Sequence, residues 1–234
     1  YVSRPDQGAV ISLTCDVPGK LSFSAGLECR LRHTCTSDGK GELILDGICP
    51  VCRAPYGEKY TDQSLIYSEH PQEQGVSFRC ILKVVAADGT LEEQSGKLVV
   101  KHATKAVLYL TVRTSFAGPD RHPALHGAEY KNACAADMKR LSEKKEGDVR
   151  MAHIFDYRSL YGLTSFSLTG SGMALQPLRE RLKRHGEQRD KGLYELLFHF
   201  GRYLLISCSR KGTRAANLQG IWNEDKKPAW SSDY

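Results

Sequence analysis

The feature that most constrains the fold is a nearly all-round apolar helix towards the end of the sequence. Asp190 is a typical helix N-cap, and a helical pattern runs from there to about Ser209. The apolar positions on one face are Leu193, Leu196, Leu197, Phe200 and Leu204, and those around the rest are Phe198, Tyr203, Leu205 and Ile206. Such a helix is normally buried inside a larger helical assembly. Loop-like residues follow it, so we expect protein outside these 234 residues to complete the assembly.

The first half of the sequence has the two-residue alternation of β-strands. Strand-like stretches lie at residues 10–15, 21–25, 43–45, 76–86, 98–100 and 106–116. Turn signals separate them, and the clearest is Asp88-Gly89, a dipeptide that tolerates the positive φ of two-residue hairpin turns. Several short strands with regular turns predict an antiparallel β-sandwich.

The pattern becomes helical after residue 117. Residues 124–146 predict a linker helix, and residues 149–160 predict a second, shorter helix. Residues 164–169 alternate again and are a candidate for a strand that returns to the first domain. The polar residues 171–189 predict an exposed connection. We therefore expect a mainly β protein with α-helices.

Charge and hydropathy exclude two classes of partner. Lysine and arginine number 33 against 27 acidic residues, a net charge of +6, and the basic residues are spread along the chain. A nucleic-acid binder would carry a basic stripe or a known motif, so we predict no nucleic-acid partner. No apolar run reaches the roughly 18 residues that span a bilayer, so we expect a soluble protein without a membrane partner. Residue 1 is tyrosine and no signal peptide is visible, so we expect the native start to be missing and leave the compartment open.

The eight cysteines do not predict a metal site. Cys49 and Cys52 have the spacing of a zinc knuckle or a redox pair, but no second close pair accompanies them. We interpret the cysteines as small buried or half-buried thiols, whose number slightly favours an intracellular, reducing compartment. His122, His126 and Glu129 could mimic a metal set, but surface or capping histidines are the commoner outcome. We predict no metal and no cofactor.

Three segments near the end carry a family resemblance. Residues 196–210 read LLFHFGRYLLISCSR, residues 216–223 read ANLQGIWN, and residues 230–234 read WSSDY. Together they closely resemble the beginning of the catalytic domain of glycoside hydrolase family 95. Residues 153–161, HIFDYRSLY, resemble the linker of that family. Residues 3–7, SRPDQ, and 18–23, PGKLSF, resemble its N-terminal domain.

The resemblance implies a domain order and an activity. It implies a β-sandwich over residues 1–117, whose start is missing, and a helical linker over residues 118–189. Residues 190–234 would begin an (α/α)6 toroid. The implied activity is that of an inverting α-L-fucosidase acting on terminal L-fucose, or on L-galactose, of a glycan. The family's water-holding asparagines, aspartate and acidic glutamate would all follow Tyr234, so this chain would hold no catalytic residue. It would be inactive without the rest of the catalytic domain.

The resemblance also selects candidate sugar-binding residues, which are Asn217, Gln219, Trp222, Asn223 and Trp230. Indole faces suit stacking on sugar rings, and amide side chains offer paired donors and acceptors to hydroxyl groups. In the alternative interpretation the tryptophans pack the loop against the toroid and the amides cap backbone groups, and we favour packing for Trp230. The alternative function is a non-catalytic β-sandwich scaffold or carbohydrate-binding module.

Overall fold

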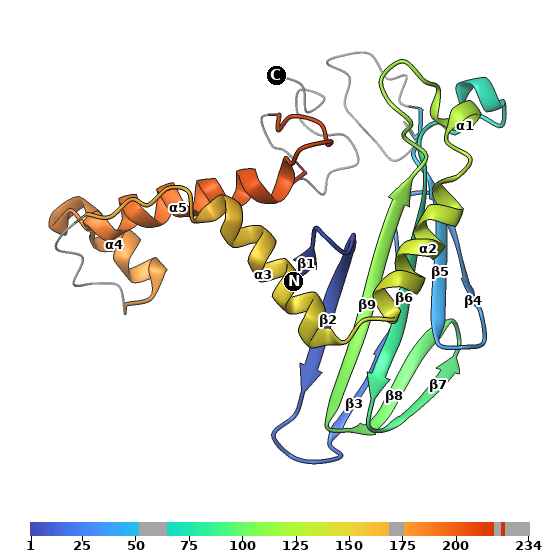
Figure 1. Ribbon diagram of the computed structural model, residues 1–234, viewed down its shortest axis with the longest axis horizontal. Coiled ribbons are helices and arrows are strands. Elements are labelled where there is room, and N and C mark those ends of the chain that lie inside the picture. Colours follow the sequence, from blue (N-terminus) through green and yellow to red (C-terminus); the bar gives the residue numbers. More distant parts are fainter. Residues whose placement is uncertain (52–64, 169–175, 218–220, 223–234) are drawn as a thin grey trace. The chain divides into compact units, whose positions relative to one another are not determined.

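The computed structural model describes residues 1–51, 65–168, 176–217 and 221–222 (Figure 1). The contacts divide the chain into two compact units, Tyr1–His153 and Ile154–Tyr234. Each unit is described by itself. The predicted domain boundaries at residues 117 and 189 stay predictions.

Two antiparallel sheets form the first unit. Their strands are β1 (Val2–Ser3), β2 (Gly8–Thr14), β3 (Leu21–Ala25), β4 (His33–Ser37), β5 (Glu42–Ile48), β6 (Ser77–Ala87), β7 (Thr90–Gln94), β8 (Lys97–Ala103) and β9 (Lys105–Thr114). The larger sheet has the order β1-β2-β9-β6-β5-β4, and the smaller one has the order β3-β8-β7. A short 3₁₀ helix, η2 (Pro71–Glu73), precedes β6. The predicted β-rich sandwich is confirmed.

An apolar layer joins the two sheets. This inter-sheet core consists of Leu43, Leu82, Val84, Leu98, Val100, Ala103, Ala106 and Leu108, all buried. The central strand β9 supplies every second residue to it, because side chains alternate between the faces of a strand. A bulge between Val84 and Ala86 adjusts the register of β6 against β9.

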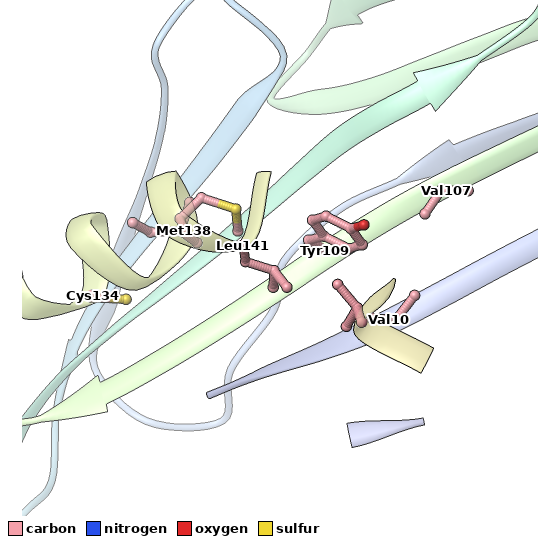
Figure 2. Packing of buried hydrophobic residues seen from close by; sticks show 8 residues of the cluster. Val10, Val107, Tyr109, Cys134, Met138 and Leu141 are labelled. Carbon is pink, nitrogen blue, oxygen red and sulfur yellow. The ribbon is translucent and has the colours of Figure 1, made fainter. Parts of the chain in front are cut away.

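The opposite face of the larger sheet is also buried, under helix α2 (Tyr130–Ser142). This outer core contains Val10, Ile81, Val107, Tyr109, Cys134, Met138, Leu141 and Val149. Figure 2 shows Cys134, Met138 and Leu141 on the face of α2 that is turned to the sheet, opposite Tyr109 of β9. The larger sheet is therefore covered by a sheet on one side and by a helix on the other.

Ion pairs attach α2 to the sheet beside the outer core. Arg113 of β9 donates from Nε to Asp137 of α2 at 2.5 Å, and Arg140 donates to the same carboxylate at 2.8 Å. Arg79 of β6 makes two hydrogen bonds to Asp46 of β5, at 2.8 and 2.6 Å. Lys131 of α2 lies 3.5 Å from Asp46.

The prediction of one helix over residues 124–146 was wrong in detail. The chain forms α1 (Pro123–His126), then α2, and α3 (Glu146–Tyr161) begins at Glu146. Gly127 ends α1 where a Cβ atom would come within 2.0 Å of the Ser115 carbonyl oxygen. The close approach of that backbone requires glycine and interrupts the helix.

Two more helices follow α3 in the second unit. The apolar helix predicted after Asp190 is confirmed as α5 (Lys191–Cys208). The prediction of a connection over residues 171–189 was wrong, because α4 (Leu178–Gln188) is helical. Its polar composition is that of an amphipathic surface helix, so polarity alone did not distinguish it from a loop. The candidate strand at residues 164–169 was also wrong, since residues 164–168 form no strand and Thr169 lies outside the described residues.

Candidate functional site

The second unit holds the part of the candidate site that the structure describes, and α5 is its main element. The Asp190 side chain accepts a hydrogen bond from the Gly192 backbone N–H at 3.0 Å, which caps the helix as the sequence predicted. Arg181 of α4 donates to both oxygens of the same carboxylate, at 2.7 and 3.3 Å. These hydrogen bonds from Arg181 hold the pKa of Asp190 below its ordinary value. Asp190 therefore stays ionised and fixes α4 against the start of α5.

A polar stripe interrupts the apolar surface of α5. It consists of Glu195, His199 and Arg202, at the spacing that places residues on one helix face. The Leu168 N–H donates to Glu195, His199 Nε2 donates to the Phe166 carbonyl at 2.9 Å, and Arg202 donates to the Thr164 carbonyl at 2.7 Å. The three side chains of the stripe thus make hydrogen bonds to backbone groups of residues 164–168 that a neighbouring strand would otherwise make. This explains why an alternating segment does not join a sheet.

Arg202 also closes the end of α3. Its guanidinium donates to the carbonyl oxygens of Tyr161 at 2.7 Å and Leu160 at 3.5 Å, the last residues of that helix. The same group lies 4.6 Å from the centre of the Tyr161 ring. A cation at a helix C-terminus is favoured by the exposed carbonyl groups there. One side chain therefore connects α3, α5 and the segment between them.

A row of aromatic rings leads from α3 to the loop after α5. Tyr161 stacks on Tyr157 with 5.2 Å between ring centres, and Tyr157 lies 6.4 Å from Tyr203. Tyr203 lies 6.4 Å from Trp222, whose side chain is 48% exposed. Burial raises the pKa of Tyr157, so the phenol of this residue within the row stays protonated. The indole of Trp222, at the other end of the row, is exposed.

The loop after α5 is anchored beside that row. Arg210 forms an ion pair with Asp156 of α3. Thr213 Oγ1 accepts a hydrogen bond from the Arg210 N–H at 2.9 Å, and the Ser209 hydroxyl donates to the Arg214 carbonyl at 3.2 Å. These contacts hold the backbone of residues 209–214, just before Asn217.

The structure locates two of the five predicted sugar-binding residues. Asn217 is half-buried and Trp222 is exposed. Gln219, Asn223 and Trp230 lie outside the described residues, so their role stays a prediction. Sequence reasoning missed Tyr203, Arg202 and Glu195. The sequence does contain a sign of the two charged residues: with His199, they fall on one face of a helix that is otherwise apolar.

The carboxylates around α5 have structural partners. Glu195 accepts from a backbone N–H, Asp156 pairs with Arg210, and Asp190 pairs with Arg181. Across residues 1–51, 65–168, 176–217 and 221–222, no three His, Cys, Asp or Glu side chains come together as metal ligands would. Within those same ranges, no helix has the length and apolar character needed to cross a membrane.

Comparison with known proteins gives two family matches. The model of the glycosyl hydrolase family 95 catalytic domain matches residues 145–234. The model of the glycosyl hydrolase family 65 N-terminal domain matches residues 1–119. The first match contains α3, α4 and α5, and the second contains the nine strands that the structure describes.

Three curated relatives agree with these matches. Alpha-L-fucosidase 2 of Arabidopsis thaliana is 33% identical over 240 residues, which cover 98% of this chain and 28% of the relative. Probable alpha-fucosidase A of Aspergillus niger is 37% identical over 40% of this chain and 12% of the relative. The protein of the same name from Aspergillus oryzae is 30% identical over 62% of this chain and 22% of the relative.

The chain thus spans less than a third of the length of each relative. The resemblance that the motifs indicated is confirmed over residues 145–234. The chain belongs to the glycoside hydrolases, with an N-terminal domain of the family 65 type followed by sequence of the family 95 catalytic domain.

Proposed function

We propose that this chain is part of an exo-glycosidase that removes terminal α-L-fucose from glycans with inversion at the anomeric carbon. The observation that carries the proposal is the family 95 match over residues 145–234, which includes α5 and the aromatic row. The names of the relatives from Arabidopsis thaliana and Aspergillus niger support the same substrate class.

The described residues have a binding role in this proposal. The exposed face of Trp222 stacks on a sugar ring, Tyr203 supports the indole from behind, and Asn217 contacts hydroxyl groups. Inverting hydrolysis needs a protonated carboxyl group and a base-activated water, with the two carboxyl groups roughly 6.5–9.5 Å apart. Asp156, Asp190 and Glu195 already bind an arginine or a backbone N–H, so we assign the reaction to groups outside this chain.

The proposal includes a partner for α5. Leu197, Phe200 and Leu205 on this helix are 70%, 53% and 57% exposed. Exposed apolar area of this kind marks a surface that another part of a protein covers. We assign that role to the remainder of the catalytic domain. On this view the chain alone does not hydrolyse a fucoside.

The test compares two proteins with one substrate. One is the chain of 234 residues, and the other is the longest open reading frame of its source that contains the chain. With an aryl α-L-fucoside, we expect the longer protein to release fucose as the β-anomer first, as followed by NMR, and the chain alone to release none. An aryl β-D-galactoside is the control substrate. Retention of configuration, or release of fucose by the chain alone, would contradict the proposal.

A variant of the longer protein tests the binding role of Trp222. Trp222→Ala removes the stacking surface and Trp222→Phe keeps part of it. We expect KM to rise by about tenfold for alanine, which corresponds to a stacking contribution of roughly 1–2 kcal/mol, and to rise less for phenylalanine. Equal KM values for the two variants and the parent would contradict the assignment.

A further inference from the structure

Two neighbouring residues of α3 hold the loop after α5 at two places. Asp156 forms an ion pair with Arg210, the second residue after the end of α5. Tyr157, the next residue of α3, has its ring centre 6.4 Å from that of Tyr203, which in turn lies 6.4 Å from Trp222. The first contact fixes the beginning of the loop, and the second leads through one ring to the exposed indole.

The ion pair is shielded from solvent more than an ordinary surface pair. The side chains of Arg210 and Asp156 are 14% and 26% exposed. The Lys183–Glu180 pair on α4 is 59% and 45% exposed, and its charged atoms lie 3.4 Å apart. Exposed pairs add little to stability, whereas removal of one partner of a shielded pair leaves a charge without its counter-ion. The Asp156 carboxylate is therefore a strong restraint on the position of Arg210.

The backbone after Arg210 forms a tight turn that passes this restraint to the following residues. The Thr213 N–H donates to the Arg210 carbonyl at 2.9 Å, and the Thr213 hydroxyl donates to the same carbonyl at 2.7 Å. Gly212 lies between them with a φ of 86°, which favours glycine. The Ser209 hydroxyl donates to the Arg214 carbonyl at 3.2 Å and closes the turn. A movement of the Arg210 side chain would therefore move the whole turn.

We propose that the Asp156–Arg210 ion pair positions the loop after α5 so that the Trp222 indole can stack on the sugar. This inference rests on the proposed function, because it uses the binding role assigned to Trp222. Asp156 and Arg210 are bound to each other and act through the loop, so they are positioning residues. An indole that binds the sugar equally in the ground state and in the transition state lowers KM and leaves kcat unchanged. Loss of the ion pair should therefore weaken binding through Trp222.

A double-mutant cycle in the longer protein tests whether the ion pair acts through the indole. We expect Asp156→Asn to raise KM for the aryl α-L-fucoside by about threefold and to change kcat by less than about twofold. Asp156→Glu keeps the charge and should leave KM closer to that of the parent. In the Trp222→Ala background, Asp156→Asn should raise KM no further, because the side chain through which it acts is absent. Glu180→Gln, which breaks the exposed pair on α4, is the matched control and should leave KM unchanged.

Two outcomes of the cycle would overturn the proposal. One is an unchanged KM for Asp156→Asn. The other is an equal rise in KM with and without the Trp222 indole, since a general loss of stability does not depend on that side chain. If Asp156→Asn does not fold, Arg210→Lys takes its place in the cycle, because it keeps the charge and loses the planar fork.

A measurement without substrate separates this proposal from the proposed function. In the 234-residue chain, Trp230→Phe leaves Trp222 as the only tryptophan. In this background we expect Asp156→Asn to speed the rotation of the indole, as followed by fluorescence anisotropy decay, and to increase its quenching by acrylamide. Glu180→Gln should change neither quantity. A longer protein without fucosidase activity would contradict the proposed function alone, and the fluorescence would still decide whether the ion pair holds Trp222. Identical fluorescence of Asp156→Asn and its parent would overturn the positioning role.

Discussion

At the scale of single residues, Arg202 illustrates a role that depends on the shape of the guanidinium group. It reaches the carbonyl oxygens of Tyr161 and Thr164 at 2.7 Å each while it lies over the Tyr161 ring. A lysine keeps the charge but loses the planar fork. We expect Arg202→Lys to lower the free energy of unfolding by about 1–2 kcal/mol and to speed amide exchange at residues 164–168.

Chemical denaturation and hydrogen exchange measure these two effects. Arg179→Lys on the exposed side of α4 is the matched control, and it should leave both quantities unchanged. Equal behaviour of the two variants would show that Arg202 does not hold the segment.

The Asp46–Arg79 pair makes a second residue-scale prediction, in acid. The hydrogen bonds from Arg79 lower the pKa of Asp46 from its ordinary value of 3.8. A carboxyl group with a lowered folded-state pKa adds stability that is complete above the unfolded-state pKa and is lost as the pH falls through the folded-state pKa. We expect the stability difference between the parent and Asp46→Asn to be constant above about pH 5 and to shrink below about pH 4.

Urea denaturation of both proteins between pH 6 and pH 2.5 would measure this difference. A difference that grows as the pH falls would contradict the assignment. Asp16→Asn, at an exposed position outside the outer core, controls for general acid effects.

Residue-scale prediction from the sequence succeeded where the signal was local. Asp190 was predicted as a cap because an N-cap side chain bonds to the backbone only two residues ahead. Arg202 was not predicted to join α3 to α5, since its partners lie about forty positions earlier in the chain. Trp222 was selected by family resemblance, and its neighbour Tyr203 was read only as part of an apolar helix.

At the scale of elements, the packing of α2 on the sheet depends on a contact with β2. Leu141 is completely buried, and a Cβ atom added at Gly8 would lie 2.6 Å from Leu141 Cδ2. Leu141→Ala should therefore cost about 2–5 kcal/mol of stability because it opens a cavity. Gly8→Ala should cost roughly 1–3 kcal/mol because it overfills the same place.

The two substitutions should compensate each other in part. A double-mutant cycle measures this coupling, and we expect Gly8→Ala to be less harmful in the Leu141→Ala background by at least about 0.5 kcal/mol. Leu125→Ala, at a position that is 51% exposed, is the control for loss of a leucine. Additive effects of Gly8→Ala and Leu141→Ala would mean that α2 does not rest on β2 at this point.

Elements were predicted from the sequence where one face was buried and the other was not. β2, β3 and β6 alternate and were found, whereas β4 and β7 were missed because all their residues are exposed and polar residues dominate. The break between α1 and α2 was missed because it depends on the Ser115 backbone beside Gly127. α4 was missed because its residues are mostly polar, and the sequence pattern does not reveal the ion pair between its Arg181 and Asp190. The breaks and burials that were missed depend on contacts outside the local pattern, and the missed strands have no buried face to reveal them.

At the scale of the whole molecule, the two units should differ in local stability. β9 pairs with β2 and β6 and contributes to both cores, while α5 has many exposed apolar side chains. Amide exchange is slow where backbone hydrogen bonds lie in a well-packed core. In the isolated chain, we expect residues 193–206 to exchange at least tenfold faster than residues 106–112.

Hydrogen exchange followed by mass spectrometry on the 234-residue chain tests this difference. The helix should become protected in the longer protein if the remainder of the catalytic domain covers it. Equal protection of α5 and β9 in the isolated chain would contradict the partner that we assign to α5.

The strand order of the larger sheet has a consequence for synthesis on the ribosome. β9 lies between β2 and β6, yet among the strands that the structure describes it is the last to be translated (Figure 1). β5 and β6 can pair early, but the edge of β6 that pairs with β9 stays open. β2 likewise lacks its neighbour β9 until residue 114 has left the exit tunnel. A nascent chain that pauses before that point would expose Ile81, Leu82 and Val84 together. Translation speed just ahead of β9 should therefore influence how much of this protein reaches the folded state, and slow codons there would favour capture by chaperones.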